Sequence, residues 1–529
     1  MTYCDVMYLA IFLPLTILVY NFMPQKHRPK VLLIASYIFF WSISRKLIIY
    51  IIASTFSIHH FGLWLSSIQE ERNRLLKEAE KSSKKEIRAQ YLKKQRNILA
   101  LAIIIHIGVL LLLKYSKFIG GNINSVFKMM NIPFTLKIHK YLMPIGISFY
   151  TLQAISYITD VYHEKIKADK NLARLALFMT FFPQIMEGPI CRYSETALQL
   201  WEGEKITYKN LSFGMQRIGY GMLKKLIIAD RLNAFIGEIF TGYKNLDGGI
   251  IAVGMVFYTL QLYMDFSGTM DMVIGSGEIF GIKLPENFRQ PFFSKTISEF
   301  WTRWHITLGA WFRDYIFYPL SLSEPLKKLT TNGRKKLGKH YGPLLASSIA
   351  LFCVWFCNGL WHGAAWGFIF FGMYHFILIL FGKIIEPPAN FILDKLHINR
   401  ELWLYKGFQI LRTTVLVFFG ELFFRAEKLK PGFIMVKKIF TEFSFKSFTN
   451  GEILNLKMDQ ADFIIIAIFT AIVFVISILR EKDINIREQI SKKNIVLRWT
   501  IYYLFMLSIL LFGAYGMGYM PVDPMYAGF

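Results

Sequence analysis

Apolar runs of about 16–20 residues recur along the whole chain, and they constrain its fold more than any other feature. Runs of this length match what an α-helix needs to cross the hydrocarbon core of a bilayer. Because lipid cannot satisfy backbone hydrogen bonds, such runs are expected to be helical. We count about ten to twelve candidates, which predicts an all-α polytopic membrane protein. Clear examples are residues 8–23, 98–113, 249–265, 366–385, 461–479 and 499–517.

The charged residues lie mainly between these runs. The formal net charge is +25, which would suggest nucleic-acid binding in a soluble protein. Here the excess of Lys and Arg is typical of cytoplasmic loops, so no nucleic-acid partner is predicted. Residues 69–97 are predicted to form a solvated basic helix on the cytoplasmic face, with a docking site for a partner as the alternative. With residues 25–30 and 480–498 also inside, both chain ends are expected outside.

Neither a leader nor a metal site is predicted. The residues before the first apolar run carry no positive charge and no clear cleavage site follows it, so residues 8–23 are expected to stay as a helix. The four cysteines form no disulfide framework. Cys353, Cys357 and His362 are close in sequence, but three mixed ligands without a fourth make a poor zinc site. The cysteines are therefore interpreted as buried apolar residues.

The apolar runs in the middle of the chain are interrupted by helix-breaking or charged residues. These are Pro144 and Gly146 in residues 141–162, Pro183, Gly188 and Pro189 in residues 179–193, and Asp265 and Asp271 in residues 260–275. Broken helices at membrane depth are tolerated only where protein or a water-filled cavity covers the freed backbone. The pattern predicts an enclosed central cavity built from short or re-entrant helices.

Residues 297–320 combine aromatic, charged and titratable side chains. Trp301, Trp304, His305, Leu308 and Phe312 follow helical spacing and would form one stripe. Glu299 and Arg303 are four apart and can pair, and Arg313 and Asp314 add charge. An interfacial or re-entrant helix is predicted, followed by a basic cytoplasmic loop over residues 327–340.

His362 lies in an otherwise apolar stretch, residues 345–372. If this stretch is helical, Asn358 shares the face of His362 and Trp366 lies one turn further on. Gly359 and Gly363 leave room for another backbone or a substrate. A buried histidine bonded to a neighbouring carbonyl is one interpretation, and a functional site is the other, because ionisable groups within membranes tend to mark sites. His59, His60, His106 and His375 also lie in or near apolar runs.

Several of these stretches together resemble the membrane-bound O-acyltransferase (MBOAT) family, in particular its bacterial branch of alginate O-acetyltransferases and teichoic-acid D-alanyltransferases. The matching motifs occur in the family's order: "PIGISFYTLQAISYITDVY", "FPQIMEGPICRY", "YTLQLYMDFSGTMDMVIG", "FGIKLPENFRQPF", "ISEFWTRWHITLGAWFRDYIFYPL" and "GLWHGAAW". The resemblance implies one integral membrane domain over residues 1–529. It would contain N-terminal spans (1–113), a catalytic core (141–385) and C-terminal spans (406–529).

The resemblance also implies transfer of an acyl group to a hydroxyl, with His362 as the catalytic base and His305 as a second functional histidine on the cytoplasmic approach. Family members often differ at Cys357 and Asn358, so no special role for Asn358 carries over. A desolvated neutral imidazole can take the hydroxyl proton as the oxygen attacks a thioester. Trp361, Asn358 or backbone N–H groups are candidate oxyanion donors. The candidate substrate and tunnel residues are Arg303, Trp304, Arg313, Asp314, Asn358, Trp361 and Asp265.

The expected donor is an acyl-CoA or an acyl-carrier-protein thioester. The charges of residues 69–97 and 327–340 are interpreted as topology signals, and attraction of an acidic carrier protein or of CoA phosphates is the alternative. The expected acceptor is an extracytoplasmic polysaccharide, reached directly or through a separate outer-face acetyltransferase or polysaccharide-export partner. The expected location is a bacterial cytoplasmic membrane, crossed many times and in contact with lipid, with no tightly bound cofactor. D-alanyl transfer to teichoic acid and, from another class, a polar-solute transporter are the alternatives.

Overall fold

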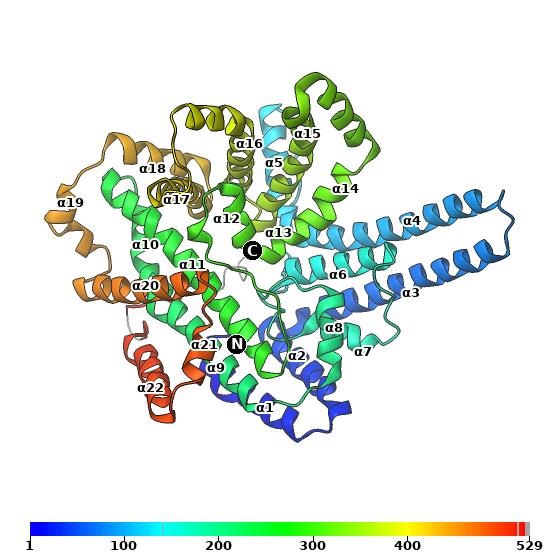
Figure 1. Cartoon of the computed structure of the whole chain (residues 1–529), viewed down its shortest axis with the longest axis horizontal. Helices are drawn as coiled ribbons and strands as arrows, with labels where there is room; N and C mark the ends of the chain where they lie inside the picture. Colours follow the sequence, from blue (N-terminus) through cyan, green and yellow to red (C-terminus); the bar gives the residue numbers. More distant parts are fainter. Residues whose placement is uncertain (140, 516–517, 524–529) are drawn as a thin grey trace. The chain divides into compact units, whose positions relative to one another are not determined.

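The computed structural model describes residues 1–139, 141–515 and 518–523 (Figure 1). Within these residues the regular structure is helical, and the one β-type pairing is an isolated antiparallel bridge between Phe288 and Trp304. The predicted run 499–517 and the predicted C-terminal region 406–529 each include residues outside the described part, namely 516–517 and 524–529. The all-α prediction is confirmed.

The helices form two compact units, and the first comprises Met1–Ile218 and Val273–Pro285. Labels beginning with η mark π-helices and 3₁₀-helices. The elements of this unit are η1 (Met7–Phe12), α1 (Leu13–Phe22), η2 (Gln25–His27), α2 (Arg28–Ser44), η3 (Arg45–Leu47), α3 (Ile48–Glu78), α4 (Lys84–Leu110), η4 (Leu111–Tyr115), α5 (Ser116–Met129), α6 (Ile147–Tyr162), α7 (Leu172–Thr180) and α8 (Tyr193–Glu202). Two helices, α9 (Tyr208–Met222) and α11 (Gly248–Ile279), contribute residues to both units.

The second unit comprises Gly219–Met272 and Glu286–Asp523. Its elements are η5 (Leu223–Ala229), α10 (Asp230–Gly242), η6 (Pro291–Phe293), α12 (Ile297–Arg303), α13 (Ile306–Phe312), η7 (Arg313–Phe317), α14 (Tyr318–Ser321), α15 (Glu324–His362), α16 (Trp366–Lys395), α17 (Trp403–Ala426), α18 (Leu429–Thr441), α19 (Lys446–Thr449), η8 (Glu452–Asn455), α20 (Gln460–Glu481), α21 (Ile486–Ser491) and α22 (Ile495–Phe512).

Eight helical stretches of the described chain are long and apolar enough to cross a membrane. They are Gln25–Glu78, Lys84–Met129, Gly248–Ile279, Glu324–His362, Trp366–Lys395, Trp403–Ala426, Gln460–Glu481 and Ile495–Phe512, and Met7–Phe22 is a shorter apolar helix. The count is below the ten to twelve predicted for two reasons. The stretch Gln25–Glu78 contains two helices, α2 and α3, and some apolar runs form helices too short to span. One example is α6, with 16 residues.

The predicted breaks in the middle of the chain are present at two of three places. Gly146 adopts a left-handed conformation (φ 77°) directly before α6, as a glycine can without steric cost. Helix α7 ends at Thr180, before Pro183. The third run lies inside the continuous helix α11, where Asp265 and Asp271 are buried and pair with Lys225 and Lys224, at 2.5 Å each.

Two predicted segments have a different form in the structure. Residues 69–97 are not one helix, because α3 ends at Glu78 and α4 begins at Lys84, and the two helices run side by side (Figure 1). Residues 327–340 are not a loop but the first part of α15, which is kinked at Gly338 (φ 79°). A Cβ on Gly333 would lie 2.7 Å from the carbonyl oxygen of Gly342, so the kink folds the two parts of α15 onto each other.

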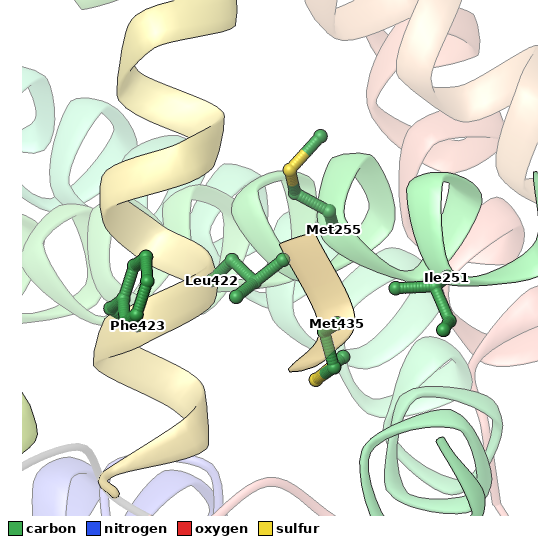
Figure 2. Packing of buried hydrophobic residues seen from close by; sticks show 5 residues of the cluster. All are labelled: Ile251, Met255, Leu422, Phe423 and Met435. Atoms are coloured by element: carbon green, nitrogen blue, oxygen red, sulfur yellow. The ribbon is translucent and has the colours of Figure 1, made fainter. Parts of the chain in front are cut away.

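An apolar cluster of buried side chains connects three helices of the second unit. Figure 2 shows its five members, which are Ile251 and Met255 of α11, Leu422 and Phe423 of α17, and Met435 of α18. All five are nearly inaccessible to solvent. Burying a side chain of this size contributes about 1.5–3 kcal/mol relative to leaving it in water. The cluster thus fixes α17 and α18 against α11 within this unit.

Candidate active site

One cavity of about 340 Å³ in the second unit collects most of the candidate residues. Its wall comes from α12, α13, η7, α15 and α16. The lining residues are Ser298, Trp301, Thr302, Trp304, His305, Ile306, Leu308, Gly309, Ala310, Phe312, Arg313, Phe317, Leu351, Val354, Trp355, Asn358, His362 and Ile379. Both histidines singled out in the sequence, His305 and His362, therefore line the same cavity.

The stretch 297–320 is not one helix. Helix α12 ends at Arg303, Trp304 is extended, and His305 adopts a left-handed conformation (φ 47°, ψ 51°) directly before α13. The predicted continuous stripe is therefore wrong as a helix surface. Its five members still line the cavity, because the two short helices wrap around the cavity wall. The predicted pair of Glu299 and Arg303 is present, with 2.9 Å between the charged atoms.

His305 is held by residues 280–292, a family motif for which the sequence predicts no role in the site. Its Nδ1 lies 3.2 Å from the side-chain oxygen of Asn287. Asn287 is fully buried and belongs to the segment that connects α11 to η6 in the sequence. The ring of Phe266 packs edge-on at 4.9 Å. Burial lowers the pKa of His305 well below its ordinary value, and a proton on His362 would lower the pKa further by repulsion. His305 is therefore neutral at physiological pH.

His362 is the last residue of α15, and the chain turns away at Gly363. It is buried, with the rings of Phe424 and Phe371 edge-on at 5.0 and 5.8 Å. Asn358 lies one turn earlier and lines the same cavity, as predicted. The side-chain oxygen of Asn358 is buried and has no hydrogen-bond partner among the described residues. It can accept a hydrogen bond from a bound molecule.

The space beside Gly359, which was predicted to admit another backbone or a substrate, is occupied by the backbone of a second helix. A Cβ on Gly359 would lie 2.6 Å from the carbonyl oxygen of Phe368 in α16. Helices α15 and α16 therefore pack backbone against backbone beside the cavity. Trp366 does not lie on the same helix as His362, because it is the first residue of α16. Its side chain is half exposed.

Four candidate residues are absent from the lining of this cavity. Arg303 pairs with Glu299 and with Glu481, and Asp265 pairs with Lys225. Asp314 pairs with Arg313, which itself lines the cavity. Trp361 is buried but is not part of the lining.

The other membrane histidines lie elsewhere. His375 of α16 is fully buried behind the cavity wall, where its ring meets Trp301 at 4.9 Å and Trp355 at 5.6 Å. His59 and His60 lie in α3 and His106 lies in α4, outside the second unit. The cavity thus distinguishes His305 and His362 from the rest, which sequence spacing could not do.

Comparison with known proteins decides the family. Residues 138–332 match the profile of the membrane-bound O-acyltransferase family, MBOAT. The probable alginate O-acetylase AlgI of Pseudomonas syringae pv. tomato is 32% identical over 432 residues, covering 81% of this chain and 73% of the relative. The chain belongs to the MBOAT family. It is an O-acyltransferase with several membrane-spanning helices.

Two other relatives show the range of chemistry within this MBOAT branch. The peptidoglycan O-acetyltransferase of Helicobacter pylori is 32% identical over 307 residues, covering 53% of this chain and 54% of the relative. The teichoic acid D-alanyltransferase of Bacillus subtilis is 34% identical over 248 residues, covering 46% and 59%. The family membership favours acyl transfer over the transporter alternative.

Proposed function

We propose that this MBOAT protein transfers an acetyl group from a cytoplasmic thioester to a hydroxyl of an extracytoplasmic polysaccharide. The hydroxyl oxygen attacks the thioester carbonyl, the carbon–sulfur bond breaks, and the products are an ester and a free thiol. His362 takes the hydroxyl proton and then gives it to the departing thiolate, so the step is balanced and the imidazole is regenerated. General-base help of this kind contributes about 10²–10⁴-fold to the rate.

The observation that carries the proposal is the shared cavity of His305 and His362. Two buried imidazoles beside one mostly apolar cavity provide a proton acceptor in a place where few water molecules compete for the thioester. A cavity of about 340 Å³ falls within the usual range for small-molecule sites. His305 is assigned to the cytoplasmic side of the reacting centre and His362 to the acceptor side.

Substrate class is proposed from the relatives. Three kinds of relative act on alginate, peptidoglycan and teichoic acid according to their names, and all three are extracellular polymers. The alginate O-acetylases align over 81–83% of this chain, which favours acetyl as the group transferred. The protein would then lie in the bacterial cytoplasmic membrane, either acting on the polymer directly or passing the acetyl group to an outer-face transferase or export partner.

D-alanyl transfer stands as the second candidate because of the teichoic acid D-alanyltransferase relatives. The two candidates differ in their donor. Purified protein in proteoliposomes is given acetyl-CoA, an acetyl-loaded carrier protein or a D-alanyl-loaded carrier protein, and free thiol release is measured with an oligosaccharide acceptor. Turnover with an acetyl donor supports the proposal. Turnover with the D-alanyl carrier alone refutes it in favour of the second candidate.

The role of His362 is tested by His362→Ala in the same assay. We expect thiol release with acceptor to fall by about 10²–10⁴-fold while membrane insertion and elution volume stay unchanged. The matched control is His106→Gln, which changes a buried histidine in α4 that lies outside the cavity. Full activity of the His362→Ala variant would show that the imidazole is not the base.

Carrier recognition by the basic part of α15 is tested separately. Residues 327–339 contain Lys327, Lys328, Arg334, Lys335, Lys336 and Lys339. Changing the four lysines at 327, 328, 335 and 336 to glutamine is expected to raise KM for the donor, and the effect should vanish as salt is raised. An unchanged KM at low salt would mean that these charges serve topology alone.

A further inference from the structure

The segment around Asn287 lies directly along the break between α12 and α13. Phe288 forms the isolated antiparallel bridge with Trp304, and the backbone N–H of Arg289 donates to the carbonyl oxygen of Arg303 at 2.9 Å. Asn287 is fully inaccessible to solvent. The break at His305 is therefore stabilised by contacts between two segments of the chain. Asn287 and His305, which are in contact, are 18 residues apart in the sequence.

Asn287 supplies the hydrogen bonds that the start of α13 lacks. The first turn of a helix exposes N–H groups without partners in the helix, and His305 at the N-cap makes no side-chain cap bond. The N–H of Ile306 donates to the backbone oxygen of Asn287 at 3.0 Å, and the N–H of Thr307 donates to its side-chain oxygen at 3.1 Å. Asn287 thus caps α13 from outside the helix.

This capping fixes which amide atom faces His305. A backbone N–H can only donate, so the atom that accepts from Thr307 must be Oδ1 and not Nδ2. The hydroxyl of Thr307 also donates to Oδ1, at 3.0 Å, and Nδ2 lies toward the sulfur of Met270, at 3.4 Å. The orientation of the amide is therefore set by the surrounding donors.

His305 Nδ1 lies 3.2 Å from the same oxygen. An amide oxygen accepts and cannot donate, so a hydrogen bond here requires a proton on Nδ1. We propose that Asn287 is a positioning residue that holds neutral His305 as the Nδ1–H tautomer, which makes Nε2 its proton-accepting nitrogen. The catalytic consequence rests on the proposed function, whereas the tautomer itself does not.

The opposite tautomer is disfavoured by the same geometry. With the proton on Nε2, the lone pair of Nδ1 would face the partial negative charge of Oδ1 inside a buried site, where such repulsion is weakly screened. Rotating the ring would separate Nδ1 from Oδ1 and change the contact with Phe266. The second nitrogen of a functional histidine is commonly set in this way by the partner of the first.

The test reads the tautomer directly. Full-length protein in lipid, labelled with ¹³C and ¹⁵N in histidine, is studied by solid-state NMR at pH 7.5, and the His305 signals are identified by difference from a His305→Gln sample. We expect Nδ1–H in the wild type, a shift toward Nε2–H in Asn287→Ala, and Nδ1–H again in Asn287→Asp, which keeps an acceptor oxygen. An Nε2–H wild type, or an unchanged tautomer in Asn287→Ala, overturns the proposal.

Activity separates positioning from capping. Asn287→Ala is expected to lower kcat by about 10–100-fold, the range found when the hydrogen-bond partner that orients a metal-bound histidine is removed, with little change in KM. The matched control is Asn171→Ala, which removes a cap of α7 that accepts from the N–H groups of Ala173 and Arg174. If Asn287→Ala and Asn171→Ala have the same kcat per folded molecule, Asn287 acts only as a helix cap and does not position His305.

The wild-type spectrum keeps the proposal testable even where Asn287→Ala fails to fold. If His305→Gln and His362→Ala remain active while wild-type His305 is Nδ1–H, the proposed acyl-transfer mechanism fails and the assignment of Asn287 stands. If His305→Gln is inactive and the wild type is Nε2–H, the assignment fails and the mechanism stands.

Discussion

Lys225→Met is expected to destabilise the second unit by about 3–5 kcal/mol, because it removes the cation between two buried carboxylates. Lys225 Nζ lies 2.5 Å from Asp265 and 3.4 Å from Asp230, and it also donates to the carbonyl oxygen of Val522 at 3.2 Å. All three charged side chains are buried. Methionine keeps the length of the side chain, so the loss is mainly electrostatic.

The size of this destabilisation follows from the least costly way in which the folded protein can neutralise the extra negative charge. Without Lys225, the net charge of the group changes from −1 to −2, and one proton taken up by a carboxylate restores −1. An aspartate with an ordinary pKa of about 3.9 needs roughly 4 kcal/mol to be protonated at pH 7, at about 1.36 kcal/mol per pH unit. This cost lies within the range measured when one partner of a buried ion pair is removed.

The sign of the pH dependence follows from the same step. Burial already raises the pKa of Asp230 and Lys225 lowers it, so without the lysine its pKa in the folded state lies further above the unfolded value. A group of this kind penalises the folded state at high pH and releases the penalty as pH falls. The deficit of Lys225→Met should therefore shrink from about 4 kcal/mol at pH 7 to about 2 kcal/mol at pH 5.5.

Equilibrium unfolding in mixed detergent micelles at pH 5.5 and 7 measures both quantities. The matched control is Lys383→Met, which removes an exposed pair with Glu386 and should cost less than about 1 kcal/mol at either pH. Adding Asp230→Asn to Lys225→Met removes the surplus charge and should recover most of the loss. A deficit under about 1 kcal/mol, or one that does not change with pH, would refute the reasoning.

Three further predictions concern the cavity. His362→Ala should lose about 10²–10⁴-fold in kcat at unchanged expression, measured by thiol release. Because burial lowers the pKa of His305, its ¹⁵N signals should remain those of the neutral ring at pH 6.5, and a charged His305 ring at pH 7 would contradict this effect of burial. Gly359→Ala should lower the midpoint of thermal unfolding by overpacking against Phe368, whereas Gly382→Ala, with open space at its Cβ, should not.

Much of the fold follows from local sequence properties. Apolar length predicts helices because a lipid-embedded backbone must bond to itself, and Gly146 and Pro183 mark true interruptions because these residue types disfavour a continuous helix. The solvated stretch 69–97 is harder to predict. Its composition suits a helix throughout, and the turn after Glu78 depends on the packing of α3 against α4.

Only part of the candidate site follows from the sequence. His305 and His362 were selected by their apolar surroundings and family motifs, and both line the cavity. Residue spacing could not place Arg303, Asp265 or Trp361, because a charged or aromatic side chain next to a site can instead pair or pack away from it. Arg303 and Asp265 both have ionic partners elsewhere.

The break at His305 shows why periodicity alone misleads at this site. A left-handed histidine is a conformation that costs about 1–2 kcal/mol for an L-residue, and a helical pattern running through it argues for a continuous helix. The strain is offset by bonds from outside the pattern, since the backbone oxygen and side chain of Asn287 satisfy the first turn of α13. At about 1 kcal/mol for each hydrogen bond, these contacts are enough to reverse the local preference. The geometry of His305 is therefore a property of two segments, and a change at Asn287 should alter the site as surely as a change in the histidine motif itself.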